Sequence, residues 1–276
     1  MTQVRTADHL DAMPVRASDL TDRGVADARD GWISKVPELT LVFWIMKIAA
    51  TTLGETGGDA VSMSLNLGYL VGSAIFAVLF LLAVGWQVAG RRFLPVRYWL
   101  AIVASTTVGT TMADYATRSL GIGYAGGSLL LLTLLGLSLF AWHRTMGSIA
   151  IGSLTSRKAE AFYWVTIMFS QTLGTAVGDW TADTAGLGYT GGMWIFGGLL
   201  AVILALYLWT RVSRTMLFWA AFILTRPLGA VIGDFLDKPI AKGGLALDRF
   251  AASGVLIAFL AACLIFLPQR PARSDH

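Results

Sequence analysis

The sequence predicts an all-α membrane protein with eight transmembrane helices, arranged as four tandem two-helix repeats with parallel pseudosymmetry. Three observations lead to this fold class: the composition, a series of eight apolar runs, and an internal repeat. Of the 276 residues, 55% are hydrophobic and only 14% are charged, whereas soluble domains carry about 25% charged residues. So much apolar surface must face lipid, which excludes an ordinary soluble enzyme and a disordered chain.

The eight apolar runs each have nearly the length of about 20 residues with which a helix crosses a bilayer. They cover residues 38–58, 67–90, 97–114, 123–142, 160–180, 188–210, 214–234 and 248–268. Helices are expected because every backbone amide in lipid must be paired within its own segment.

The basic residues predict the orientation of these runs. Of the 21 lysines and arginines, 15 fall in the N-terminal arm, at the C-terminus or in the alternate loops that share their side. The positive-inside rule then places both termini in the cytoplasm. The chain is therefore expected to pass through its membrane many times.

Four segments of eight residues repeat one pattern, in which a glycine precedes an aspartate by five positions. The segments are Thr52–Asp59, Thr107–Asp114, Thr172–Asp179 and Pro227–Asp234. A second glycine follows the first by fourteen positions in every copy. The predicted organisation is a cytoplasmic tail 1–36, repeats 37–92, 93–146, 147–212 and 213–270, and a cytoplasmic tail 271–276. Each repeat starts and ends on the same side, so the repeats are parallel.

The first helix of each repeat carries the polar residues. Positions three, four and seven apart share one face of a helix, so the threonine, the middle residue and the aspartate form a stripe. The four stripes are Thr52, Glu55 and Asp59; Thr107, Thr110 and Asp114; Thr172, Thr175 and Asp179; Pro227, Ala230 and Asp234. We expect these first helices to line a central region.

Carboxylate and hydroxyl oxygens are hard ligands that Mg²⁺, Ca²⁺ and Mn²⁺ prefer. The expected metal ligands are Asp59, Asp114, Asp179 and Glu55. The threonines Thr52, Thr107 and Thr172 are expected to add oxygens to the same ion site. Bound Mn²⁺, Mg²⁺ or Ca²⁺ is the only cofactor that the residues suggest.

Repeat four departs from this pattern because Arg226 and Pro227 stand where the other copies have polar side chains. Arg226 is therefore expected to hold Asp234 as a structural pair. Lys47 is expected to pair with Glu55 or another acid, or to reach toward the membrane surface.

The function expected from these residues is transport of a hard divalent cation, with manganese favoured, through carboxylates in the membrane. A pseudo-fourfold cation channel is an alternative, as is a protein that binds a lipid or a hydrophobic pigment without transport. A structural interpretation also stands, in which the aspartates only cap helices or pair with Arg118, Lys238 or Arg249. Trp44, Trp142, Trp194 and Trp209 are expected to form an interfacial belt.

Other functions find no support in the residue pattern. No Ser-His-Asp set or zinc motif is evident, so an enzyme is not expected. The single cysteine, Cys263, excludes a disulfide within the chain. The expected partners are membrane lipids and a small cation substrate, with a homo-oligomer left open. No basic stripe points to nucleic acid.

The tandem pattern Thr-x-Gly-x4-Asp, followed by Leu/Ile-Gly-Tyr-x2-Gly, resembles the bacterial membrane family built from four "domain of unknown function 347" repeats. Its members are often labelled membrane-anchored proteins. The resemblance covers about residues 37–270, and repeat four departs from the motif. It implies an integral inner-membrane protein but brings no activity with it, so function must be argued from the site.

Cysteine labelling tests the predicted orientation. In a Cys263→Ala background, Leu10→Cys and Ser274→Cys should both be protected from a membrane-impermeant thiol reagent in intact cells, because both termini are expected inside. Each cysteine should react after the cells are permeabilised. Reaction at either position in intact cells would contradict the orientation.

Overall fold

The structure is a computed structural model that describes residues 35–90, 92–151, 154 and 156–272. The chain divides into two units, Met1–Trp32 and Ile33–His276. The first unit and the last four residues lie outside the described part, and with them nearly all of the predicted N-terminal tail and most of the C-terminal one.

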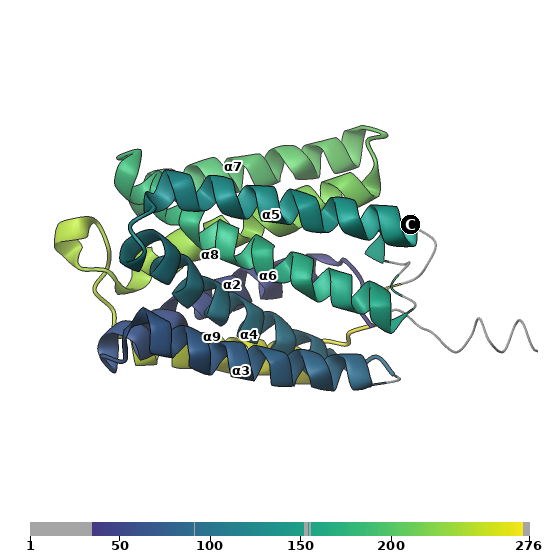
Figure 1. The fold of residues 1–276 in the computed structure, drawn as a ribbon, viewed down its shortest axis with the longest axis horizontal. Coiled ribbons are helices and arrows are strands. Elements are labelled where there is room, and N and C mark those ends of the chain that lie inside the picture. Colours follow the sequence, from purple (N-terminus) through teal and green to yellow (C-terminus); the bar gives the residue numbers. More distant parts are fainter. Residues whose placement is uncertain (1–34, 91, 152–153, 155, 273–276) are drawn as a thin grey trace, which may run out of the picture. The chain divides into compact units, whose positions relative to one another are not determined.

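Eight α-helices are present in the described residues, and all eight coincide with the apolar runs of the sequence (Figure 1). Four of them carry the repeated Gly-x4-Asp pattern: α2 (Leu41–Asp59), α4 (Pro95–Asp114), α6 (Arg157–Asp179) and α8 (Arg214–Asp237). The other four are α3 (Gly68–Ala89), α5 (Gly123–Met146), α7 (Gly188–Trp209) and α9 (Arg249–Phe266).

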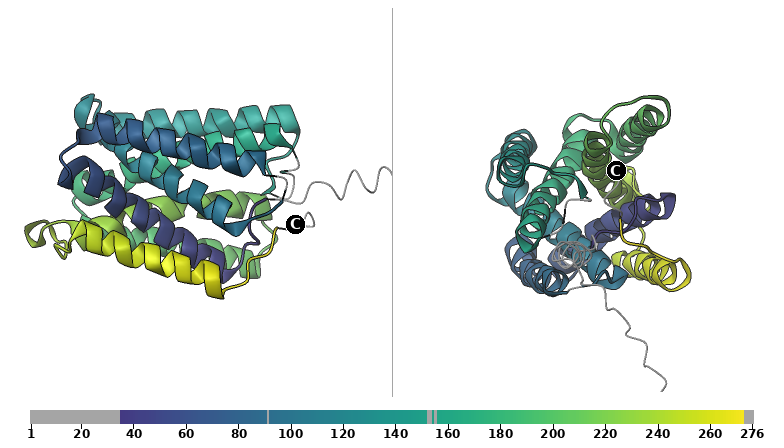
Figure 2. Two further views of the ribbon diagram at one scale, coloured as in Figure 1. Left: turned by 90° about the horizontal axis from the view of Figure 1, so that it is seen from below. Right: turned by 90° about the vertical axis from the view of Figure 1, so that its right-hand side faces the viewer.

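The four pattern-bearing helices form a closed inner ring. Helix α2 packs on α4, α4 on α6, α6 on α8, and α8 back on α2. Each outer helix then packs on the inner helix of the following repeat: α3 on α4, α5 on α6, α7 on α8, and α9 on α2. Seen nearly along the helices, α3, α5, α7 and α9 occupy the four corners (Figure 2, right). The polar stripes thus lie on the central helices, as their sequence pattern predicts.

Local signals explain where the inner helices begin. The Thr40 hydroxyl accepts a hydrogen bond from the Phe43 amide at the start of α2, and the Ser156 hydroxyl does the same for the Ala159 amide in α6. Such N-caps satisfy amides that lack a partner within the helix. Pro95 occupies the first turn of α4, where its missing N–H costs nothing.

Glycine at the turns allows the chain to enter the outer helices. Gly68, Gly123 and Gly188 have positive φ angles and are the first residues of α3, α5 and α7. Residues with a Cβ rarely adopt this conformation. These are the second glycines of the sequence repeat, so their recurrence reflects one turn used three times.

Five helices in the described part are long and apolar enough to cross a membrane, namely α3, α5, α7, α8 and α9. This finding indicates a membrane protein. Most of the residues of α2, α4 and α6 are buried, and many of the buried ones are polar. Their composition therefore reflects contact with other helices more than contact with lipid.

The first glycine of each repeat is required by close helix packing. A Cβ at Gly54 would overlap Thr106, and one at Gly174 would overlap Arg226. The same relation links Gly109 to Gln171 and Gly229 to Thr51, so each glycine faces the next helix of the ring. Small residues of this kind let helix backbones approach closely in membrane proteins.

Gly54→Ala is predicted to lower stability by about 1–3 kcal/mol, the usual cost of overpacking a tight contact. Gly197→Ala on α7 is the matched control, because a Cβ there meets nothing within 4 Å. Thermal unfolding in detergent, followed by tryptophan fluorescence, measures both. Equal melting temperatures for the two variants would show that the ring does not depend on this contact.

Candidate functional site

The four repeated aspartates lie at one end of the inner helices. Asp59, Asp114 and Asp179 are each the last residue of an α-helix that continues directly into a π-helical turn. The turns are Ala60–Ser64, Tyr115–Ser119 and Trp180–Thr184. Single π turns within helices are rare and frequently occur at functional sites. Asp234 differs, because α8 runs on to Asp237 without such a turn.

Arg118 joins two of these aspartates. Its guanidinium lies 2.9 Å from Asp114 of the same helical segment and 3.0 Å from Asp179 on α6. Both carboxylates are buried, whereas the Arg118 side chain is 31% exposed. One cation at the rim therefore serves two buried anions.

Lys238 joins the other two aspartates. Its ammonium contacts Asp59 of α2 and lies 3.0 Å from Asp234. Burial disfavours the charge of Lys238, but the carboxylates of Asp234 and Asp59 outweigh this effect and raise the pKa of its ammonium above the ordinary value. Lys238 therefore stays charged at neutral pH.

A third cation extends the Lys238 group toward the surface. Arg249 binds Asp237 at 2.5 Å and lies 3.9 Å from Asp59. The structural interpretation expected ion pairs of the aspartates with Arg118, Lys238 or Arg249, and the structure contains such pairs. This interpretation accounts for the charges of these cations but leaves several carboxylate oxygens with no hydrogen-bond donor among the described residues.

Arg226 lies deeper, among all four inner helices. Its guanidinium is 3.2 Å from the Glu55 carboxylate and donates to the hydroxyls of Thr110 and Thr175, each at 2.5 Å. It also donates to backbone oxygens on three helices. These are Thr51 on α2 at 3.1 Å, Thr106 on α4 at 3.3 Å and Gln171 on α6 at 3.2 Å. The side chain is fully buried.

The expected pair of Arg226 with Asp234 is therefore wrong. The two residues are eight positions apart on one helix, which separates them by about 12 Å along its axis. Arg226 instead pairs with Glu55, and Asp234 with Lys238. Lys47 makes no ion pair in the described residues and places its buried ammonium 4.1 Å from the centre of the Phe222 ring.

The carboxylates that could share a metal ion differ from the expected set. Glu55, Asp59 and Asp234 each offer an oxygen, and these atoms lie within 4.8 Å of one another. Asp114 and Asp179 gather around Arg118 instead. Glu55 and Asp59 were expected as ligands from the sequence pattern, whereas Asp234, the third member of this group, was not.

The expected threonine ligands face elsewhere. The hydroxyls of Thr52, Thr107 and Thr172 each donate to the carbonyl four residues earlier in their own helix. Thr110 and Thr175, from the middle of the same stripes, contact Glu55 at 3.2 and 3.4 Å. The middle position of the stripe therefore supplies the hydroxyls at the centre.

The charges of this cluster do not balance. Its ion pairs form three groups: Arg226 with Glu55, Arg118 with Asp114 and Asp179, and Lys238 and Arg249 with Asp59, Asp234 and Asp237. Together they contain six carboxylates and four cations. Two negative charges remain when all ten groups are ionised. One oxygen each of Asp59 and Asp179 is buried and accepts no hydrogen bond from the described residues.

Sequence reasoning missed an aromatic layer at the opposite end of the inner helices. An aromatic residue followed by tryptophan occurs eleven positions before each first glycine: Phe43-Trp44, Tyr98-Trp99, Tyr163-Trp164 and Phe218-Trp219. Their rings contact one another around the ring of helices, and the hydroxyls of Tyr98 and Tyr163 lie 2.8 Å apart. The repeated dipeptide was the signal that could have revealed it.

The expectation of a tryptophan belt needs a correction. Trp194 and Trp209 are more than 80% exposed, but Trp142 is fully buried against Tyr163 and Trp219. Trp142 therefore extends the aromatic layer instead of anchoring the surface.

Comparison with known families fits this architecture. Residues 42–93, 97–148, 162–213 and 217–268 match the family described as Repeat of Unknown Function (DUF347). The chain belongs to this family, as its tandem motif suggests, and it contains four copies of the repeat. No curated protein and no solved structure matches the chain.

Arg226→Gln is predicted to lower stability by about 3–5 kcal/mol, because it leaves the Glu55 carboxylate buried without its cation. Adding Glu55→Gln to this variant should recover a large part of the loss. Arg144→Gln, at an exposed arginine, is the control and should change stability by less than about 0.5 kcal/mol. Denaturant unfolding in detergent measures these three variants, the single variant Glu55→Gln and the unchanged protein. Strictly additive losses in the double variant would contradict the pair.

Proposed function

We propose that this protein is a carrier that moves a hard divalent cation across a membrane. In this proposal all eight helices cross the bilayer, and the four repeats surround an axis along the membrane normal. Both termini lie on the cytoplasmic side of a bacterial inner membrane. The aspartate end of the inner helices then faces away from the cytoplasm.

The observation that carries the proposal is the excess of two negative charges over the ion-paired groups, one around Arg118 and one around Lys238 and Arg249. Buried charge without compensation is costly, and one divalent cation would remove the imbalance. Glu55, Asp59 and Asp234 provide the group of oxygens with the spacing of shared ligands. Carboxylates suit Mg²⁺, Ca²⁺ and Mn²⁺, of which manganese is the ion the proposal favours.

The internal cations suggest how binding and release are linked. Lys238 contacts both Asp59 and Asp234, so an incoming cation competes with its ammonium. Arg226 competes in the same way for Glu55. A divalent ion that displaces them binds more weakly than it would in a free acidic cage, which favours release on the other side. Protons can replace the ion at the same oxygens during the return step.

The residues that fill the centre of the inner ring favour a carrier over a channel. Arg226 donates hydrogen bonds to α2, α4 and α6 from its position on α8, so its side chain lies across the centre of the ring. A further layer lies about one helical turn beyond Arg226, on the side away from the aspartates. It consists of one residue from each inner helix, all fully buried: Lys47, Ile102, Ile167 and Phe222. The aromatic layer follows beyond them. A conducting pore would require these layers to open together.

Ion uptake into vesicles tests the proposed function. Purified protein in vesicles should take up Mn²⁺, measured with an enclosed metal-sensitive dye, and Mg²⁺ and Ca²⁺ should be compared under the same gradient. Glu55→Gln, Asp59→Asn and Asp234→Asn should each reduce uptake by about tenfold or more, because each removes a charged ligand.

Asp183→Asn is the matched control for these variants. Asp183 lies at the same end of the bundle, is exposed, and hydrogen-bonds Tyr124 outside the ion-paired groups. It should transport like the unchanged protein. Metal binding by calorimetry separates lost affinity from lost movement. Normal uptake by all three carboxylate variants, with folding intact, would refute the proposed site.

A further inference from the structure

A cavity of about 640 Å³ lies on the side of the helix bundle, between α2, α7 and α8. Along α8 it extends from Arg214 to Thr225, a rise of about 16 Å. It reaches Ile48 on α2 and Leu200 on α7 at its inner end. It lies apart from the carboxylate cluster, toward the end of the bundle where α2 and α8 begin.

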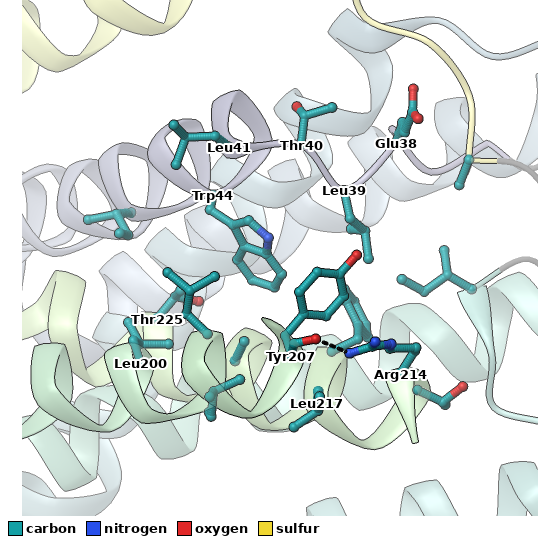
Figure 3. Close-up of a pocket in the computed structure, with 18 of the residues that line it drawn as sticks. Glu38, Leu39, Thr40, Leu41, Trp44, Leu200, Tyr207, Arg214, Leu217 and Thr225 are labelled. Carbon is teal, nitrogen blue, oxygen red and sulfur yellow. Dashed lines mark hydrogen bonds between the residues drawn. The ribbon is translucent and has the colours of Figure 1, made fainter. Parts of the chain in front are cut away.

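The walls of this cavity are mostly apolar. Its lining includes Trp44, Leu200, Leu204, Tyr207, Leu217 and Phe218. Figure 3 shows the rings of Trp44 and Tyr207 facing one another across the space between α2 and the α7–α8 pair. Near its inner end, the hydroxyl of Thr225 already donates to the Phe222 carbonyl. The deep part therefore offers mainly apolar contacts.

Charged groups of both signs lie at the mouth. Arg214 is exposed, stacks 4.2 Å from the centre of the Tyr207 ring and donates one hydrogen bond of 2.5 Å to the Tyr207 carbonyl. These contacts fix the guanidinium at the rim, where its other N–H groups can meet an anion. Glu38 lies at the α2 side of the same mouth (Figure 3).

We infer that this cavity binds one phospholipid with a zwitterionic, amine-bearing headgroup of the phosphatidylethanolamine type. One acyl chain lies along α8 between Trp44 and Leu204, the phosphate meets Arg214, and the ammonium meets Glu38. The volume is in the range of small-molecule sites, about 300–1,000 Å³. The inference does not depend on ion transport.

Native mass spectrometry of protein released from nanodiscs tests the inference. The nanodiscs contain equal amounts of phosphatidylethanolamine and phosphatidylglycerol. The unchanged protein should retain one phosphatidylethanolamine per chain. Arg214→Gln should reduce the retained fraction by about tenfold, since it removes a charge-assisted contact to phosphate. Arg214→Lys should restore part of it. Ala201→Trp, which fills the cavity from α7, should abolish retention.

Two matched controls show whether the cavity itself is responsible. Arg211→Gln removes an exposed arginine three residues before Arg214, and Val202→Trp places the same ring on α7; neither residue lines the cavity. Both controls should retain the lipid, and an unchanged elution volume confirms folding for every variant. The inference is overturned if the unchanged protein retains no lipid or prefers phosphatidylglycerol. It is equally overturned if the Arg214→Gln and Arg211→Gln proteins retain it alike.

Discussion

A single guanidinium connects the four inner helices, and much of the interior is arranged to hold it. Arg226 reaches from α8 to Glu55, Thr110 and Thr175 and to three backbone carbonyls. In lipid a charge of this kind is tolerated only when it is fully paired and directed toward the bundle interior. The hydroxyls at the middle of each polar stripe and the single glutamate of repeat one meet that requirement. Gly174 makes room for the arginine stem, because any side chain there would occupy the same space.

The sequence predicted the fold and the central location of the polar helices because both follow from local patterns. Apolar length identified the eight helices, and a stripe repeated four times on alternate helices indicated one shared interior. Pairing between helices was less predictable. The partner of Arg226 depends on axial height: Glu55 on α2 lies within reach of the long arginine side chain, whereas Asp234 lies two turns away on its own helix. The eight-residue separation of Arg226 and Asp234 within one helix was therefore sufficient to exclude their pairing.

Other parts of the site could not be predicted from the sequence of any single helix. Lys238 stands four residues after Asp234, which predicts a contact within α8, but its second contact with Asp59 requires the neighbourhood of α2 and α8. Helices α2 and α8 become neighbours because the ring of inner helices closes. Gly229 on α8 packs against Thr51 on α2, and this contact joins the last repeat to the first. The aromatic layer was predictable, since its dipeptide recurs in register with the glycines. Its rings are mostly apolar, so the stripes of polar residues gave no indication of it.

Differences among the repeats at the position four residues after the aspartate explain why the site is divided. Four equivalent aspartates around an axis would repel one another equally and would favour no single arrangement of ligands. Arg118 in repeat two draws Asp114 and Asp179 together, and Lys238 in repeat four draws Asp59 and Asp234 together. Glu55 lies one turn below the second pair, so three carboxylates gather on one side of the axis. Sequence divergence among the repeats thus gathers the carboxylates of Glu55, Asp59 and Asp234 into one group within an inner ring of four similar helices.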